Sequence, residues 1–391
     1  MLVRLVCTAR GHGYRDLIES VWSEAKAAGI PLPTDRPVSA AAFCKARRRL
    51  KSEAIRVLLH DCAATFEGEH GRRHRWNGRR LLAIDGTKFS TQRSDELFEA
   101  FGRSPRGHTP HVQLLTLYDV LSQVPLDGTV DGYAAHERRL AMPLLEHVRK
   151  RDILLLDRGF PSHEFIDTLM DREIDFVMRV STESSFRAVE AFMASGRTEQ
   201  VIELKAKRIA PGVWTSSRRV RAVRGVDSTG QPEVLLTNLT RTAASRKQVL
   251  ELYRLRWGVE TFYGSMKSKC FDPDQFHSRT ADGVRQEIFA ALLVQALTRT
   301  FMAEAARKHR VAYVELAHKN ALVAVAEKIV VSLLSTDLRR SREMLAALLK
   351  RISRHHAKKR PGRSFKRRSF RPHPKWDANG TWAGGRRSKL G

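Results

Sequence analysis

The chain has 391 residues and carries 70 lysine and arginine side chains against 42 aspartate and glutamate, a formal net charge of +28. Such an excess repels itself unless a polyanion screens it, and nucleic acid is the commonest polyanion that proteins bind. With 42% hydrophobic residues the chain is predicted to fold, but no window approaches 18 uninterrupted apolar residues, so we expect no membrane partner.

The polar motifs exclude two other kinds of site. The four cysteines are scattered, with no C-x-x-C and no histidine cluster at zinc-ligand spacing, and we interpret all of them as reduced. The stretch DGTKFS at 85–90 lacks the glycine-rich loop that holds nucleotide phosphates, so no nucleotide cofactor is expected. The amino-terminal residues lack a signal-peptide pattern, which favours a cytoplasmic protein.

Helices are predicted at the start of the chain, because apolar residues recur every three to four positions from Tyr14 to about Phe66. Ser39 is the predicted N-cap of the second helical stretch, 38–66. On that stretch Arg47 and Arg48 are candidates to follow a DNA backbone. Successive helical residues point in different directions, however, so part of this basic run must simply be solvated.

A mixed sheet with helices packed against it is predicted for the middle of the chain. Short apolar runs bounded by turn residues indicate its strands. The predicted strands are 81–85, 111–120, 123–133, 153–157 and 175–181, and the predicted helices are 136–150, kinked by Pro143, and 161–174.

The remaining segments differ in character. Residues 183–233 are predicted to be a β-rich insertion, and 233–240 to return to the sheet. A helix is expected across 253–267 and a helical region over 281–349. The tail 350–391 has fifteen lysines and arginines and one acid, so it is expected to stay flexible until it meets a polyanion.

Asp85 and Asp157 each end a predicted apolar strand. If those strands are neighbours, both carboxylates emerge at the same sheet edge, where sites are usually found. The alternative is that both are ordinary strand-ending turn residues, for which aspartate is favoured.

Glu260 lies in a patterned segment, YRLRWGVETFYGSMK, at 253–267. At 100° per residue, Tyr253, Arg256, Glu260 and Lys267 fall within a sector of about 60° on one helix. An apolar sector adjoins it, formed by Leu252, Leu255, Val259, Phe262 and Met266. The alternative is a salt-bridged polar face without function.

The spacing Y-x2-R-x3-E-x6-K resembles the signature of the insertion-sequence-four type of bacterial DDE transposases. AIDGTKF and LLLDRGF are similar to the two aspartate strands of that family, and the segment 276–293 to the helix after its glutamate. The β-rich stretch also sits where the family places its insertion. The resemblance covers roughly residues 38–300.

The resemblance implies a mixed α/β fold with a ribonuclease-H-like core. In it, Asp85, Asp157 and Glu260 would hold two Mg²⁺ ions, for which Mn²⁺ is an expected substitute. Two such ions can activate a water or 3′-hydroxyl and stabilise the leaving oxygen without ATP.

The same resemblance implies that Arg256 and Lys267 clamp DNA phosphate oxygens beside the glutamate and that Tyr253 donates to one or stacks on the DNA. Arg158 could contact DNA or merely balance the carboxylates. Two tryptophans are candidates for an aromatic platform under a flipped base, with packing as the alternative: Trp214 and Trp257.

The expected protein is a transposase that binds the terminal inverted repeats of its element, cleaves the ends and joins the 3′ ends to target DNA. It would act as a homodimer on double-stranded DNA in the bacterial nucleoid. Two alternatives stay open: a decayed or captured copy that only binds DNA, and a structure-selective ribonuclease-H-like nuclease. The expected units are a helical DNA-binding region (1–75), the core (76–182 and 234–305), the insertion (183–233), a helical region (306–349) and the basic tail (350–391).

Overall fold

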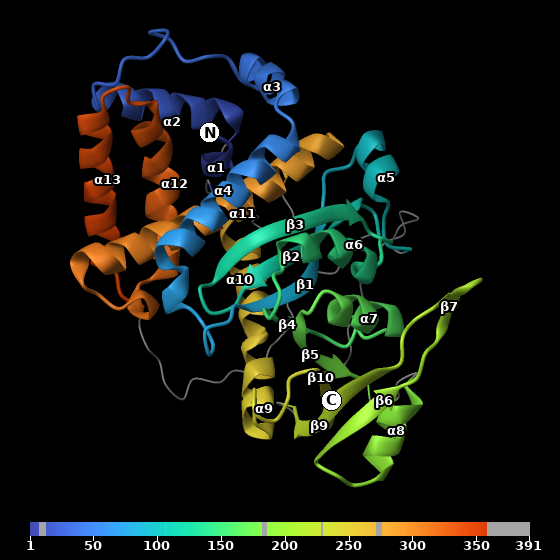
Figure 1. Ribbon diagram of the computed structural model, residues 1–391. Coiled ribbons are helices and arrows are strands. Elements are labelled where there is room, and N and C mark those ends of the chain that lie inside the picture. Colours follow the sequence, from blue (N-terminus) through green and yellow to red (C-terminus); the bar gives the residue numbers. More distant parts are fainter. Residues whose placement is uncertain (8–12, 106, 182–185, 228–229, 271–275, 358–391) are drawn as a thin grey trace, which may run out of the picture.

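An eight-stranded mixed sheet forms the centre of the molecule (Figure 1). The computed structural model describes residues 1–7, 13–105, 107–181, 186–227, 230–270 and 276–357. In spatial order the strands are β3 (Val124–Gly132), β2 (His111–Asp119), β1 (Leu81–Ser90), β4 (Ile153–Leu156), β5 (Asp175–Val180), β10 (Pro232–Thr237), β9 (Arg218–Val226) and β6 (Glu199–Leu204).

The first five strands have the ribonuclease-H-like order 3-2-1-4-5. β1, β4 and β5 are parallel, whereas β2 runs antiparallel to both β1 and β3. The predicted fold class, mixed α/β with a ribonuclease-H-like core, is confirmed.

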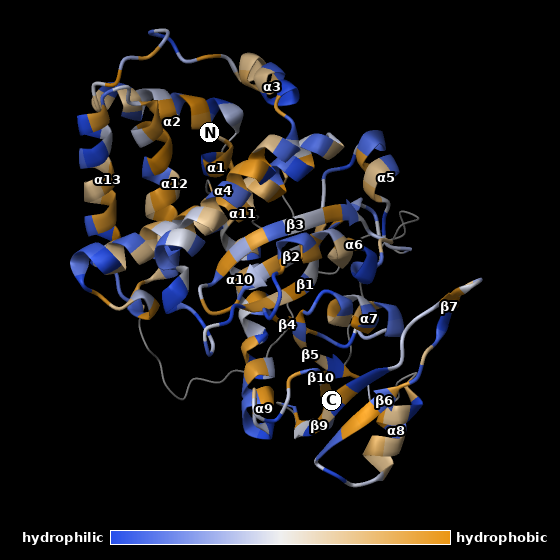
Figure 2. Cartoon of the chain, viewed as in Figure 1, coloured by the Kyte–Doolittle hydropathy of each residue, from blue (hydrophilic) through white to orange (hydrophobic). Residues whose placement is uncertain are grey.

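Both faces of the sheet are buried, which explains why the strands are nearly continuous apolar runs. On β1, Leu81 and Ala83 point into one core and Leu82 and Ile84 into the other, as the alternation of a strand requires. Helices α4 (Ser52–His70) and α11 (Ala281–His309) cover the first face. Helices α6 (Glu137–Leu144) and α7 (His163–Asp171) cover the second. Figure 2 shows apolar residues concentrated on the sheet and on the helix surfaces that face it.

Helix α11 runs through the interior. Among the described residues it is the one helix long and apolar enough to cross a membrane, by length and composition alone. However, 72% of its most apolar window is buried within the protein, so packing accounts for its composition.

The terminal helices share the first core with α11. They are α1 (Leu2–Leu5), α2 (Tyr14–Ala27), α3 (Ala40–Arg49), α12 (His318–Leu334) and α13 (Leu338–Ser353).

Ser39 caps α3 as predicted, accepting a hydrogen bond from the backbone N–H of Ala42. The predicted stretch 38–66 is divided into two helices, because the chain is extended at Leu50 and Lys51. Shorter elements are α5 (Asp95–Phe101), η1 (Gly71–Arg73), η2 (Leu145–His147) and η3 (Tyr313–Glu315).

The β-rich stretch extends the core sheet. β9 pairs with β10, and β6 pairs with β9, so both strands continue the ribonuclease-H-like sheet at its β5 edge. Helix α8 (Arg187–Ala194) packs on β6. The small hairpin of β7 (Arg208–Ala210) and β8 (Val213–Trp214) projects away from the body (Figure 1).

Two predicted elements end elsewhere than expected. β1 continues past Asp85 to Ser90 because this half of the strand pairs with β2. The helix predicted for 136–150 ends as α6 at Leu144, just after Pro143, and tightens into η2. Most of the predicted basic tail, 358–391, lies outside the described residues.

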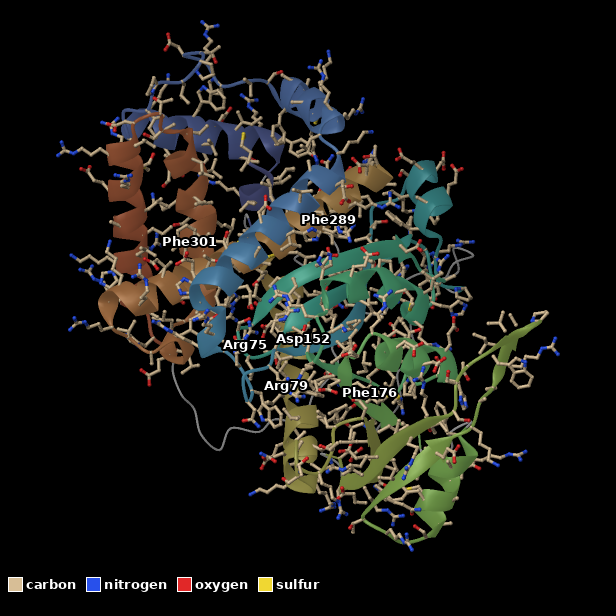
Figure 3. The ribbon with its side chains drawn as sticks, in the orientation of Figure 1. Arg75, Arg79, Asp152, Phe176, Phe289 and Phe301 are labelled. Carbon is tan, nitrogen blue, oxygen red and sulfur yellow. The ribbon has the colours of Figure 1, made fainter. Side chains whose placement is uncertain are left out.

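Ion pairs fasten the amino-terminal ends of the parallel strands. Arg80 pairs with Asp152 in the interior, and its guanidinium also donates to the carbonyl of His147 at 2.9 Å. Arg79 pairs with Asp175 at the start of β5. Figure 3 shows Arg79 and Asp152 together at this end. The candidate site lies further along, at Asp85 in the middle of β1 and at Asp157 directly after β4.

Candidate active site

Strand register brings the two predicted aspartates together. β1 and β4 are parallel neighbours, and their pairing runs to Ala83 opposite Leu155. Two residues further along each strand are Asp85, within β1, and Asp157, directly after β4. The condition on which the sequence analysis depended, that the two strands are neighbours, is therefore met.

A tyrosine fastens the glutamate helix to β1. The hydroxyl of Tyr263, on α10 (Trp257–Lys269), donates to the backbone carbonyl of Asp85 at 2.6 Å. Glu260 lies three residues before Tyr263, about one helical turn, so this bond holds the glutamate over the aspartate strand. Tyr263 was not among the site residues predicted from the sequence. The sequence feature that could have indicated it is a hydroxyl group at the border between the polar and apolar sectors of the predicted helix.

The predicted single helix across 253–267 is wrong. The chain forms α9 (Arg246–Leu255) and α10, which meet at Arg256. There the N–H of Arg256 donates to the carbonyl of Tyr253, and Val259 donates to Arg256, both three residues apart rather than four. This tight turn changes the helical phase. As a result Leu255, expected in the apolar sector, is 42% exposed.

The guanidinium of Arg256 lies between two of the carboxylates. Its Nη2 is 2.7 Å from Oε1 of Glu260, and its Nη1 is 3.7 Å from Oδ2 of Asp85. The side chain of Arg256 is largely buried. Ion pairs shielded from water are stronger than exposed ones, so Arg256 ties α10 to β1 electrostatically.

The charge of Asp85 is influenced by both of the other acids. Burial raises the pKa of Asp85 to about 6, Arg256 opposes this shift, and the charges of Asp157 and Glu260 add to it. Among the described residues, the ligand atoms of these three acids do not all lie within 4.8 Å of one another.

A tighter ligand group lies elsewhere. The side chains of His60, Asp127 and His147 bring their ligand atoms within 4.8 Å of one another. Asp127 is fully buried and also accepts two hydrogen bonds from Arg56, at 2.8 and 2.7 Å. Burial alone would raise the pKa of Asp127, but bonds from Arg56 and the histidines hold it well below its usual range. This group joins α4 to β3 and η2.

The other residues of the signature differ in exposure. Tyr253 is 8% exposed, and burial raises the pKa of its hydroxyl to about 12, so the hydroxyl remains a hydrogen-bond donor at neutral pH. Its ring centroid is 5.8 Å from the guanidinium carbon of Arg256. The Nζ of Lys267 lies 5.2 Å from the ring centroid of Phe89, on β1. Arg158 is exposed beside Asp157.

The structure contradicts the prediction that Arg47 contacts DNA. Arg47 is buried and forms an ion pair of 2.6 Å with Glu287 on α11, which is itself fully buried. It also donates to the carbonyl of Gly283 and to the hydroxyl of Tyr14, each at 2.6 Å. A buried charge needs partners of this kind, so Arg47 joins α3 to α11. Its neighbour Arg48 is exposed, and DNA contact there remains a prediction.

The two tryptophans are on the surface. Trp214 is 64% exposed at the projecting hairpin, and Trp257 is 50% exposed at the start of α10. Core packing therefore does not explain either of them.

A further acid, absent from our sequence predictions, faces Asp157. Glu137 begins α6, and Nε2 of Gln113 donates to its Oε1 at 3.2 Å. Burial raises the pKa of Glu137, and the charge of Asp157 adds to this shift. The sequence offered only an acid in the first turn of a helix, which is common.

The donor chemistry of the site fits magnesium. All its acidic ligands are carboxylates, the hard oxygen donors that Mg²⁺ prefers. Burial and like charge make ionisation of Asp85 costly, and a bound cation would offset that cost.

The strand order and the acidic site define a protein of the ribonuclease-H-like class. Residues 76–297, more than half of the chain, match the family described as "Transposase DDE domain". The chain belongs to this family of DDE transposases, and the predicted insertion-sequence-four type is confirmed.

Curated relatives agree. The chain is 25% identical over 281 residues to "Transposase InsG for insertion sequence element IS4" of Escherichia coli (strain K12), covering 69% of this chain and 63% of that protein. It is 24% identical over 199 residues to "Probable transposase for insertion sequence element IS5377" of Geobacillus stearothermophilus, covering 49% of this chain and 50% of the relative. The chain thus spans less than two thirds of these relatives.

A solved structure aligns more loosely. It is titled "Cryo-EM structure of piggyBac transposase synaptic complex with hairpin DNA (SNHP)". The alignment covers 93% of this chain and 86% of that one, at 10% identity and a TM-score of 0.47. This similarity is too low to support a conclusion about the protein.

Proposed function

We propose that the protein is a DNA transposase that binds the terminal inverted repeats of an insertion sequence, cleaves its ends and transfers the 3′ ends to target DNA. One observation carries the proposal. Asp85 and Asp157 lie on neighbouring parallel strands, and Arg256 pairs with both Asp85 and Glu260. The signature helix is therefore assembled onto the aspartate strands.

Asp85, Asp157 and Glu260 would hold two Mg²⁺ ions, with Mn²⁺ as a substitute. When bound, such ions supply positive charge at the scissile phosphate and make a water or 3′-hydroxyl a better nucleophile. Asp85 would be the central ligand, because its strand pairs with that of Asp157 and Arg256 links it to Glu260.

The basic residues of the signature would hold the DNA. With cations at the carboxylates, the guanidinium of Arg256 can donate to a phosphate oxygen in place of Glu260. Lys267, two turns further along α10, would contact the next phosphate. The hydroxyl of Tyr253 would donate a hydrogen bond to the DNA backbone. Its pKa is about 12, so it is protonated at neutral pH. Exposed Arg158 is placed to contact the same strand.

The rest of the chain would supply affinity and pairing. The charge of +28 suits nucleoid DNA as the partner. We assign end recognition to residues 1–75, including Arg48, and backbone binding to the tail 350–391. Joining two ends at once requires two protomers, so a homodimer on DNA is expected.

Cleavage of a labelled element end tests the proposal. With Mg²⁺ or Mn²⁺, the wild-type chain is expected to nick the end and join it to target DNA. Glu260→Ala should bind the end but not cut it. The matched control is Glu251→Ala, which removes an exposed acid from α9 and should cut like wild type. Equal cutting by Glu260→Ala would refute the proposed site.

The same assay separates the two alternatives. A copy that only binds DNA would retain the end without cutting it in any variant. A structure-selective nuclease would cut branched or hybrid substrates and join nothing. Inverted repeats flanking the reading frame, with a short target duplication, would favour the transposase.

A further inference from the structure

Glu137 and Asp157 face each other across a space that two glycines leave open. A Cβ at Gly159 would lie 3.2 Å from Oδ1 of Asp157 and 3.6 Å from Oε2 of Glu137. A Cβ at Gly86, next to Asp85 on β1, would come within 2.6 Å of Oε1 of Glu137. Both carboxylates thus border the volume that a side chain at Gly159 would fill, and Glu137 also borders Gly86.

A buried amide also points to a ligand here. Gln113 on β2 is 1% exposed, and its Nε2 donates to Glu137. Its other polar atom, Oε1, is buried and has no hydrogen-bond partner within the described residues. Leaving such a buried atom unsatisfied destabilises the folded protein. A cation, or a water bound to one, beside Glu137 would satisfy it.

Among the described residues, neither Glu137 nor Asp157 forms an ion pair. Lys88 is the cation whose charge acts on Glu137. However, the ammonium of Lys88 donates to the carbonyl of Tyr133 at 3.0 Å and lies 3.9 Å from the centroid of that ring. Arg256, in contrast, pairs with Asp85 and Glu260. The Asp157 side of the site therefore has less compensating charge than the Glu260 side.

We propose that Glu137 is a fourth carboxylate of the active site and, together with Asp157, binds a divalent cation in the space beside Gly159. This inference rests on the proposed function and adds a ligand outside the family signature. α6 follows β3 and packs on β2 and β3, and its first residue reaches both Gly86 on β1 and Gly159 after β4. The competing role for Glu137 is an acid that only stabilises the first turn of α6.

Manganese binding to the full chain without DNA tests the proposal. Mn²⁺ is titrated into the protein, and the free ion is followed by electron paramagnetic resonance. We expect Glu137→Gln to weaken binding of one ion by at least about tenfold. The matched control is Glu146→Gln, an exposed acid in η2 immediately after α6, which should bind like wild type. If Glu137→Gln also binds like wild type, the proposal is overturned.

Two further variants distinguish the loss of a metal ligand from misfolding of the protein. Gly159→Ala places a methyl group between the two carboxylates and should weaken the same binding event. Glu137→Asp keeps a carboxylate and should bind more tightly than Glu137→Gln. A purely structural Glu137 would lower the unfolding midpoint in the glutamine variant and leave Mn²⁺ affinity unchanged in Gly159→Ala.

Asp85→Asn and Glu260→Gln distinguish this inference from the proposed function. If both lose Mn²⁺ while Glu137→Gln retains it, only the role of Glu137 fails. If neither loses it, the metal site of the proposed function fails as well.

Discussion

Two groups of charged side chains in this protein have opposite balances of charge. At Asp127, one fully buried carboxylate is surrounded by Arg56, His60 and His147. Beside the middle of β1 and the end of β4, four acids share far less positive charge. The acids of the second group are Asp85, Asp157, Glu260 and Glu137.

The difference is the one expected between a structural group and the proposed functional site. A buried charge that only stabilises the fold needs its full set of partners inside the protein. A group of partly buried acids that repel one another costs folding free energy, unless a cation or substrate supplies the missing charge. The pKa values agree, because that of Asp127 is held well below its usual range whereas that of Asp85 is raised to about 6.

The largest expected effect comes from substituting one of the four acids of the second group, Asp85. Asp85→Asn should slow strand cleavage at least about 10³-fold, which corresponds to about 4 kcal/mol of transition-state stabilisation. Its unfolding midpoint in urea should be unchanged or higher, because the variant no longer buries a repelled carboxylate. Cleavage assays and urea unfolding in EDTA measure the two effects. If Asp85→Asn lowered the urea midpoint as strongly as it lowered cleavage, Asp85 would be a structural residue like Asp127.

Substituting Asp127, the carboxylate of the first group, should lower stability and leave cleavage unchanged. Asp127→Asn leaves the guanidinium of Arg56 without its carboxylate and should lower the free energy of unfolding by about 3 kcal/mol, the low end for a broken buried pair. The control is Asp131→Asn, which removes an exposed ion pair with Arg139 and should change stability by less than about 1 kcal/mol. Cleavage per folded molecule should be normal in both variants.

Acid should erase the stabilisation that Asp127 provides. Its folded pKa is lowered, so its contribution is complete above the ordinary aspartate value and is lost as the pH falls below about 4. We expect the difference in urea midpoint between wild type and Asp127→Asn to persist from pH 7 to 5 and to shrink below pH 4. A difference that already vanished by pH 5 would show that Asp127 is not stabilised as an anion.

The smallest effect concerns DNA affinity at the edge of the acidic group. Lys267→Gln should weaken binding about equally for all sequences and reduce the slope of log affinity against log salt by about 0.7–0.9. Lys150→Gln is the control, because this exposed lysine precedes β4 at the other end of the strand and pairs with Glu173. Fluorescence anisotropy at several salt concentrations measures both slopes. Equal slopes for the two variants would exclude a phosphate contact at Lys267.

Sequence patterns predicted much of the fold and part of the site. Apolar runs marked all five ribonuclease-H-like strands, and turn residues closed them. Motif spacing selected Glu260 and Arg256, which the structure joins to Asp85. The patterns failed at Arg256 itself, where a turn of three residues changes the helical phase and exposes Leu255. Periodicity assumes an unbroken helix and cannot register such a turn.

The sequence by itself determined the local structure and the kinds of side chain available, because alternation and helical spacing are short-range properties of the chain. Only the tertiary structure decided what each charge meets. Arg47 is structural because α11 brings Glu287 to it, and Glu137 and Asp157 border the same glycine because the fold brings the start of α6 to the residues after β4. Partners so distant in sequence leave no periodic trace, so only the fold determines whether a charge is compensated.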